Sequence, residues 1–390
     1  MDRAISALFF LAALACAQSP EWFLQGSAPD PGGRAIVGAG GKVLSIAPPG
    51  GGRGIAPVVP GCSRSPLCGN RFDGPRSGLQ RVEWKQTMGY TFAYPVDLPQ
   101  GGGVSAAKVD SRGNLWVFQR NAAGKPQLFE FGPDRKLMRT VGDDVIGHQE
   151  KAHGMAVDAQ DNVWICDANG STIMKLSAEG KLLLTIGVKG RRGDWNEAKE
   201  QRLLWQPLDL AFAPNGDIYI GEGHANESPN DAGSDDPADN VGAARVIRLD
   251  KNGRFIQQWY GNSIGQGKFS MVHGIAIDPR DGNVWIGDRE EYRLVVYTPD
   301  GKFVKTVQMR NLMCAIAFDP QGNLWVATGQ DGQLLKIDRN GTVLGAVGNG
   351  SGTGDGQYIE SNYLSWDRQG NIYTGDTSVG RVTEWVAAQR

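Results

Sequence analysis

The chain has 390 residues, with 40 lysines and arginines against 42 aspartates and glutamates, so its formal net charge at pH 7 is −2. This balance excludes the strongly basic face on which nucleic-acid binding depends, and we expect no nucleic-acid partner. A chain of this length would by default form two or three domains, unless a repeat closes into a single ring. The 55 glycines and 11 tryptophans favour the ring, with many tight turns and one large aromatic side chain per repeat.

Residues 1–17 predict a secretory signal peptide. Met1-Asp2-Arg3 precedes an apolar run over residues 4–15, and the triplet Ala15-Cys16-Ala17 favours cleavage after Ala17. The apolar run is too short to remain as a membrane-spanning helix, so we expect no integral membrane span and a secreted or periplasmic protein. Cys16 leaves a lipoprotein as the alternative, although Ala13 stands where a lipoprotein signal has a large aliphatic residue.

Residues 18–102 predict an irregular covering segment, because they are rich in glycine and proline and lack the repeat that follows. Cys62 and Cys68 lie in this segment, and export would allow them to form a small disulfide loop. Two free thiols are the alternative. The stretch 81–98 contains strand-like patches and is a candidate for a strand that joins the repeat.

Six copies of a β-hairpin pattern occupy residues 103–390. In each copy two alternating strands flank a turn of Asp, Asn and Gly, and an aromatic residue follows in the second strand. The six turns span residues 110–116, 158–164, 214–219, 278–285, 319–325 and 367–373. Spacings of about 40 to 60 residues match the four-stranded blade of a propeller. We therefore predict an all-β, six-bladed β-propeller.

The last repeat ends at Arg390 after three clear strands. A strand from the N-terminal segment should therefore complete the last blade, close the ring and cover its open edge. A ring of this kind is expected to be a monomer. Cys166 falls within a predicted strand, where packing is a better explanation than chemistry.

Aligning the hairpins identifies one position near the start of each first strand. The residues at this position are Ser105, His153, Leu208, His273, Cys314 and Asn362. Because the innermost strands of a propeller line its central channel, these six side chains should surround the channel mouth. Alternate blades are about 120° apart, so His153, His273 and Asn362 could converge as the three ligands of a zinc site with an open position. An amide oxygen is a weak ligand for zinc.

The residue that follows the second strand is Arg120 in the first blade and Arg289 in the fourth. Antiparallel hairpins return to the edge from which they start, so both arginines should lie on the histidine face. Guanidinium groups match carboxylates, which predicts a small anion or a carboxylate-terminated peptide as ligand. No carboxylate occupies any ring position, so we expect nothing to neutralise the arginines at the mouth. Pairing of each arginine with a neighbouring Asp or Glu is the alternative.

The third repeat carries an insertion between Glu222 and Ala244 that begins with His224 and leaves from the same edge. Long loops on rigid scaffolds often carry binding function. The acidic residues of this loop could hold Ca²⁺, and a solvated acidic loop is the alternative. These acidic residues are Glu227, Asp231, Asp235, Asp236 and Asp239.

Parts of this sequence resemble the peptidylglycine α-amidating lyases. The resemblance lies in the runs Ala152–Asp158 and Val272–Asp278, in Asp288-Arg289-Glu290 after the second run, and in Phe118-Gln119-Arg120 of the first blade. The resemblance covers roughly residues 103–385. It implies a propeller of the NHL type that uses zinc to split a peptidyl-α-hydroxyglycine into a peptide amide and glyoxylate.

Carried onto this sequence, the resemblance implies that His153 and His273 are zinc ligands and that Arg120 and Arg289 are active-site residues. Asn362 stands where the family has its third histidine ligand. His224 stands where the family has a tyrosine proposed as the catalytic base. An imidazole titrates near neutral pH, so His224 is a candidate base, and a third metal ligand is the alternative role.

Two other functions remain open from the sequence. The chain could be a non-catalytic extracytoplasmic binding propeller whose metal site has decayed, because fold alone does not decide function. A calcium-dependent hydrolase or lactonase would need carboxylates at the ring positions, which the six aligned residues do not supply.

Overall fold

The computed structural model describes residues 88–98, 102–223, 244–261, 268–269, 271–289, 293–309, 313–328, 332–350 and 352–388. It also gives the course of two short antiparallel strands, β1 (Ala35–Val37) and β2 (Val43–Ile46). The predicted signal peptide, Cys62, Cys68 and the insertion with His224 lie outside the described residues.

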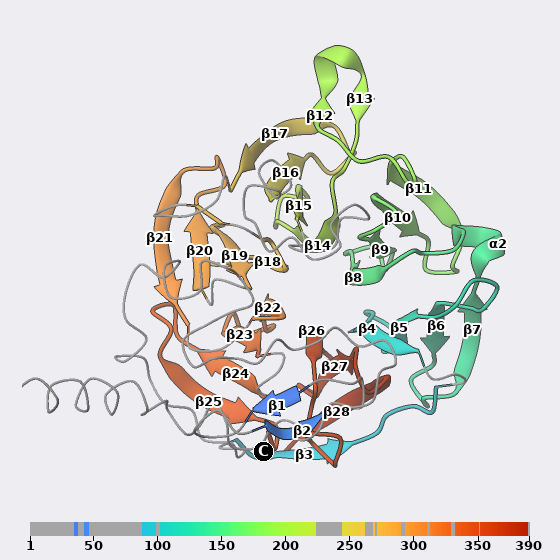
Figure 1. The fold of residues 1–390 in the computed structure, drawn as a ribbon, viewed down its shortest axis with the longest axis vertical. Coiled ribbons are helices and arrows are strands. Elements are labelled where there is room, and N and C mark those ends of the chain that lie inside the picture. The colour runs from blue at the N-terminus through green and yellow to red at the C-terminus, as the bar shows by residue number, and fades with distance from the viewer. Residues whose placement is uncertain are drawn as a thin grey trace, which may run out of the picture.

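The described strands form six four-stranded antiparallel sheets arranged around one axis (Figure 1). This confirms the predicted all-β, six-bladed propeller. Blade one contains β4 (Gly103–Val109), β5 (Leu115–Arg120), β6 (Leu128–Phe131) and β7 (Leu137–Val141). Blade two contains β8 (Ala152–Val157), β9 (Val163–Asp167), β10 (Thr172–Leu176) and β11 (Leu182–Gly187). Blade three contains β14 (Pro207–Phe212), β15 (Ile218–Glu222), β16 (Arg245–Leu249) and β17 (Phe255–Tyr260).

The second half of the ring repeats this plan. Blade four contains β18 (Gly274–Ile277), β19 (Val284–Asp288), β20 (Arg293–Tyr297) and β21 (Phe303–Gln308). Blade five contains β22 (Ala315–Phe318), β23 (Leu324–Ala327), β24 (Leu334–Ile337) and β25 (Val343–Val347). Blade six contains β26 (Ser361–Trp366), β27 (Ile372–Asp376), β28 (Arg381–Ala387) and β3 (Tyr90–Ala93).

Short elements lie between the blades. The helix α2 (Asp143–Ile146) precedes blade two. The hairpin of β12 (Trp195–Asn196) and β13 (Gln201–Arg202), with the 3-10 helix η4 (Glu197–Lys199) at its tip, projects outward between blades two and three (Figure 1). Among the described residues, the structure contains no helix that is long and apolar enough to cross a membrane.

An aspartate opens five of the six hairpin turns, with Ala213 in its place in blade three, and its bonds explain why the turn sequence recurs. In blade two, one oxygen of Asp158 accepts from the backbone nitrogens of Gln160 and Asn162 at 2.9 Å, and the other accepts from Trp164 Nε1 at 3.0 Å. Asp319 makes the equivalent three bonds in blade five, ending on Trp325 Nε1 at 2.9 Å. The carboxylate thus fixes the turn and orients the buried tryptophan.

The ring is closed by β3, the first strand of the propeller along the chain and the outermost strand of blade six. It pairs antiparallel with β28, with Phe92 opposite Trp385. The rings of these two residues pack edge to face with centroids 5.4 Å apart. The last repeat supplies only three strands of blade six, and β3 is the fourth strand expected from the N-terminal segment. It covers the edge of β28.

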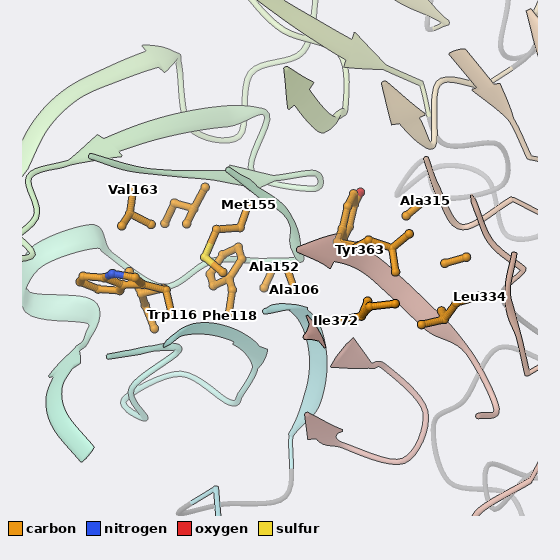
Figure 2. Close-up of a cluster of buried hydrophobic side chains, with 14 of the residues drawn as sticks. Ala106, Trp116, Phe118, Ala152, Met155, Val163, Ala315, Leu334, Tyr363 and Ile372 are labelled. Atoms are coloured by element: carbon orange, nitrogen blue, oxygen red, sulfur yellow. The ribbon is translucent and has the colours of Figure 1, made fainter. Parts of the chain in front are cut away.

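Apolar side chains fill the spaces between neighbouring blades. Figure 2 shows Trp116 and Phe118 of blade one against Met155 and Val163 of blade two, with Tyr363 drawn from the innermost strand of blade six. Burying one such side chain typically stabilises a fold by about 1.5–3 kcal/mol. Cys166 belongs to another of these clusters and is fully buried. The packing holds the six innermost strands in place around the channel.

Candidate functional site

His153 and His273 meet at one end of the central channel. His153 lies in β8 and His273 immediately precedes β18, and each is at most 2% exposed. The centroids of the two imidazole rings are 4.9 Å apart, with the ring planes at 65°. Blades two and four therefore bring together the histidines that the hairpin alignment places at the same position.

Backbone carbonyls fix the tautomer of both imidazoles. Nδ1 of His273 lies 2.7 Å from the carbonyl oxygen of Cys314, and Nδ1 of His153 lies 2.9 Å from that of Leu208. A carbonyl oxygen can only accept, so each Nδ1 carries the proton and each Nε2 carries the lone pair. This is the arrangement found in histidines that bind metals through Nε2.

Tyr363 lies directly against the two histidines and was not singled out by the sequence analysis. Its phenol oxygen is 2.6 Å from the carbonyl oxygen of Leu208 and 2.7 Å from Nδ1 of His153. Its ring is nearly parallel to that of His273, with centroids 6.5 Å apart. Burial raises the pKa of Tyr363 well above its usual range, so the phenol stays neutral and donates to the carbonyl.

The backbone at Tyr363 is unusual, since its φ of 44° lies in the left-handed region. The same position in blades two and four is occupied by Gly154 and Gly274. A left-handed conformation costs a non-glycine residue of order 1–3 kcal/mol, and such strain persists only where the surroundings enforce it. Extending the hairpin alignment by one residue would have drawn attention to a tyrosine at a position otherwise held by small residues or Asp209.

Asn362 supplies an amide group at the third ring position. It is 2% exposed, and its Nδ2 donates to Thr377 Oγ1 at 3.4 Å. Its Oδ1 is buried and has no hydrogen-bond partner within the described part of the chain. A buried acceptor without a partner costs about 1–3 kcal/mol, which favours a ligand at this oxygen.

The donor set tests whether a metal fits. Across the described residues, no group of three or more His, Cys, Asp or Glu side chains is placed to hold a metal ion. Two imidazoles of the correct tautomer and one unpartnered amide oxygen nevertheless offer three donors. Because zinc prefers nitrogen to an amide oxygen, these three donors would hold a divalent metal more weakly than three histidines would.

Arg120 and Arg289 lie near the histidines in different settings. Arg120 ends β5 and is half-buried, and its Nε donates to Ser105 Oγ at 2.9 Å and to the carbonyl oxygen of Ala152 at 3.0 Å. Arg289 follows β19 and is 4% exposed, and its Nη2 lies 2.9 Å from Glu360 Oε1. Ala152 and Glu360 lie one and two residues before the ring positions of their blades.

Glu360 corrects the expectation that no carboxylate meets the arginines at the mouth. It lies outside the six aligned positions, so the alignment did not include it. Burial lowers the pKa of Arg120, the charge of Glu360 opposes that shift, and the charge of Arg289 adds to it. The guanidinium groups of Arg120 and Arg289 and the carboxylate of Glu360 therefore lie close enough for their charges to interact, and guanidinium groups suit a ligand that carries a carboxylate.

The remaining histidine of the described chain stands apart from this site. His148 is half-buried in the loop between α2 and β8, and its backbone carbonyl accepts a hydrogen bond from Lys189. His224 lies outside the described residues, so its role as base stays a prediction.

The fold and this site define a six-bladed β-propeller that gathers paired histidines and an arginine–glutamate cluster at one channel mouth. The chain resembles the peptidylglycine amidating enzymes. It is 27% identical over 261 residues to the mouse peptidyl-glycine alpha-amidating monooxygenase. The aligned region covers 59% of this chain and 24% of the mouse protein.

Lyases with related names are also similar. The Drosophila melanogaster peptidyl-alpha-hydroxyglycine alpha-amidating lyase 1 is 23% identical, covering 56% of this chain and 42% of the fly protein. A probable lyase of the same name from Caenorhabditis elegans is 22% identical, covering 50% of this chain and 56% of the nematode protein. The chain thus spans between about a quarter and just over half of the length of these relatives. No family model matches it.

Solved structures share the fold at low identity. A gluconolactonase from Xanthomonas campestris has a TM-score of 0.56 at 16% identity, covering 78% of this chain and 91% of that structure. Virginiamycin B lyase from Staphylococcus aureus has a TM-score of 0.52 at 13% identity, covering 77% of this chain and all of that structure. These likenesses concern the propeller architecture alone.

Proposed function

We propose that this chain is a metal-assisted lyase that cleaves a peptidyl-α-hydroxyglycine into a peptide amide and glyoxylate. The observation that carries the proposal is the pairing of His153 and His273, each with Nδ1 against a backbone carbonyl, beside Arg120, Arg289 and Glu360. The similarity to amidating enzymes supports the same reaction.

In this proposal His153 and His273 hold a divalent metal, zinc in the first instance, with Asn362 as the third protein donor. When bound, the metal supplies a positive charge that stabilises negative charge developing on the substrate oxygen. Arg120 and Arg289 bind the substrate carboxylate and orient the α-carbon. Glu360 holds the Arg289 side chain in position through their ion pair.

The reaction moves one proton and breaks one bond. A base removes the proton of the α-hydroxyl group, the carbon–nitrogen bond breaks, and the departing amide nitrogen takes up a proton. We assign His224 as the base, because an imidazole titrates near neutral pH and its loop leaves the propeller from the histidine face. The products are the peptide amide and glyoxylate, with no redox change.

We place this activity outside the cytoplasm, because residues 1–17 have the pattern of a secretory signal. The alternative is a binding propeller that recognises a carboxylate-terminated peptide without turning it over. Asn362 favours this alternative, since replacing a histidine ligand by an amide weakens a zinc site.

A glyoxylate-release assay with a synthetic peptidyl-α-hydroxyglycine, run with added zinc, tests the proposal. We expect turnover by the wild type, and at least a tenfold loss of both turnover and zinc affinity in His153→Ala. His148→Ala is the matched control and should retain both, because His148 lies outside the ring. Peptide binding without glyoxylate release would support the binding module, and zinc affinity equal in wild type and His153→Ala would overturn the metal site.

A further inference from the structure

The central channel contains a cavity that Tyr363 lines. Its volume is about 390 Å³, and all six innermost strands line it with residues that follow their ring positions. None of His153, His273, Arg120 and Arg289 contributes to its wall. It is therefore distinct from the candidate metal and carboxylate site.

Lys108 brings an ammonium group to this cavity. Its Nζ donates to the carbonyl oxygen of Leu364 at 2.6 Å and lies 5.9 Å from the centroid of the Tyr363 ring. An ammonium has three N–H donors, and among the described residues Leu364 is its single hydrogen-bond acceptor. Burial lowers the pKa of Lys108, and the negative charge of Asp209 opposes this shift only in part.

Asp209 brings a carboxylate to the same cavity from β14. It is 5% exposed, and its two oxygens accept from the backbone nitrogens of Leu210 at 2.9 Å and Ile275 at 3.1 Å. No ion pair joins it to Lys108 within the part of the chain that the structure describes. Each carboxylate oxygen retains capacity for a further hydrogen bond. The cavity therefore holds one positive and one negative group that do not contact each other.

The rest of the wall combines polar and apolar surface. Phe212, Phe318 and Trp366 lie at the ends of their strands, and aliphatic side chains of β18 and β22 line the interior. A volume of 390 Å³ is near the lower limit of ligand pockets, which span about 300–1,000 Å³. This size suits a molecule as small as a single amino acid rather than a peptide.

We propose that this cavity binds a small zwitterion with an apolar side chain, of the α-amino acid class. The ligand carboxylate contacts Lys108, the ligand ammonium contacts Asp209, and the apolar side chain packs against the aromatic residues. Each charge then gains a direct contact with a group of opposite sign, whereas Lys108 and Asp209 act on each other without such a contact. The inference does not depend on the lyase reaction, because the two sites share no charged residue.

The test is calorimetric titration of the full chain with L-leucine at pH 8, beside two analogues that each lack one charge. These are 4-methylpentanoate, which lacks the ammonium, and 3-methylbutylamine, which lacks the carboxylate. We expect leucine to bind at least tenfold more tightly than either analogue. Equal affinity for leucine and 4-methylpentanoate would overturn the zwitterion in favour of a simple anion site, and no leucine binding at millimolar concentration would overturn the site itself.

Variants locate the binding. Lys108→Met keeps most of the apolar stem and should weaken leucine binding at least tenfold. Lys175→Met is the matched control, because Lys175 is also half-buried beside an aromatic ring and a carboxylate but lies in β10, away from the cavity. Ala317→Phe fills the cavity without changing any charge and should abolish binding, which keeps the test decisive if Lys108→Met fails to fold. Undiminished leucine binding by Ala317→Phe would contradict the assignment.

Discussion

The phenol oxygen of Tyr363 lies 2.7 Å from Nδ1 of His153, and both atoms are in hydrogen-bonding contact with the carbonyl oxygen of Leu208. Since the carbonyl accepts from both, the phenol donates to the carbonyl and accepts from the imidazole. Three blades therefore contribute to the position of one ring. In the candidate metal site Tyr363 therefore acts by orienting His153, a proposed ligand, rather than as a ligand itself.

Tyr363→Phe should weaken zinc binding while leaving the fold intact. The change removes the hydroxyl group that orients His153 and keeps the ring that packs beside His273. Loss of a group that orients a metal-binding histidine typically costs 10–100-fold in affinity. Competition with a zinc chelator measures the effect.

The control is Tyr358→Phe. Tyr358 is also fully buried in blade six, but its hydroxyl group bonds to Thr383 Oγ1 and Trp385 Nε1 instead. This variant should lose stability without losing zinc affinity beyond the effect of unfolding. Equal zinc affinity in Tyr363→Phe and the wild type would refute the role of the phenol.

Asn362→His should tighten zinc binding by at least tenfold. The substitution replaces a buried amide oxygen that lacks a partner with a nitrogen donor that zinc prefers. Equilibrium dialysis of wild type and variant at the same pH measures the change. An unchanged affinity would mean that Asn362 does not share a metal with His153 and His273.

Arg120→Met and Arg289→Met should each weaken binding of a carboxylate-terminated peptide by roughly ten- to a hundredfold, since hydrogen bonds to charged groups are worth about 1.5–3 kcal/mol. Their effects on stability should differ. Arg289 is paired with a buried Glu360, and removing one partner of a buried ion pair costs about 3–5 kcal/mol. The sequence alone does not reveal which carboxylate pairs with Arg289, so it gives no reason to expect this difference.

Glu360→Gln tests whether the negative charge beside Arg120 and Arg289 raises or lowers the affinity for the peptide. It removes the negative charge beside the arginines, so peptide affinity should rise rather than fall. Arg248→Met is a control in blade three, where Arg248 pairs with Asp217, and it should leave binding unchanged. Weaker peptide binding by Glu360→Gln would show that the charge of Glu360 matters more for holding Arg289 in position than for offsetting the charge of the arginines.

Asp209 predicts a pH dependence of stability. Burial raises its pKa from 3.8 to about 7, so in the folded protein the carboxyl keeps its proton over a range where the unfolded chain has lost it. Between about pH 4 and pH 7 the folded state thus binds more protons, and this group makes the free energy of unfolding fall as pH rises. Relative to wild type, Asp209→Asn should therefore gain stability across this range, by on the order of a few kcal/mol. Urea unfolding at pH 5 and pH 8 measures the difference, and parallel pH profiles for the two proteins would contradict it.

The repeated hairpin turns were enough to predict the propeller from the sequence. The candidate site could be predicted only in part. Asp158 and Trp164 are six residues apart and bond to each other, so a local pattern carries the structure of the hairpin. Arg289 and Glu360 are 71 residues apart and meet because the ring brings their blades together. Aligning equivalent positions finds features that repeat, such as the two histidines.

Single departures from the repeat are invisible to such an alignment. Tyr363, Lys108 and Asp209 each occur in one blade, and their importance comes from neighbours in other blades. Nothing near Lys108 in the sequence indicates that its ammonium faces the ring of Tyr363. Physical proximity across the channel, rather than sequence spacing, makes these residues a group.

Ring closure by β3 has a consequence for how two molecules could associate. The backbone of β3 (residues 90–93) pairs with the backbone of β28 over residues 384–387. The same pairing can form whether the two strands come from one molecule or from two. A β3 strand from a second copy offers the same partners and the same Phe92–Trp385 contact. Refolding at high protein concentration therefore favours exchange of this strand, which would yield dimers in which each ring is fastened by its neighbour.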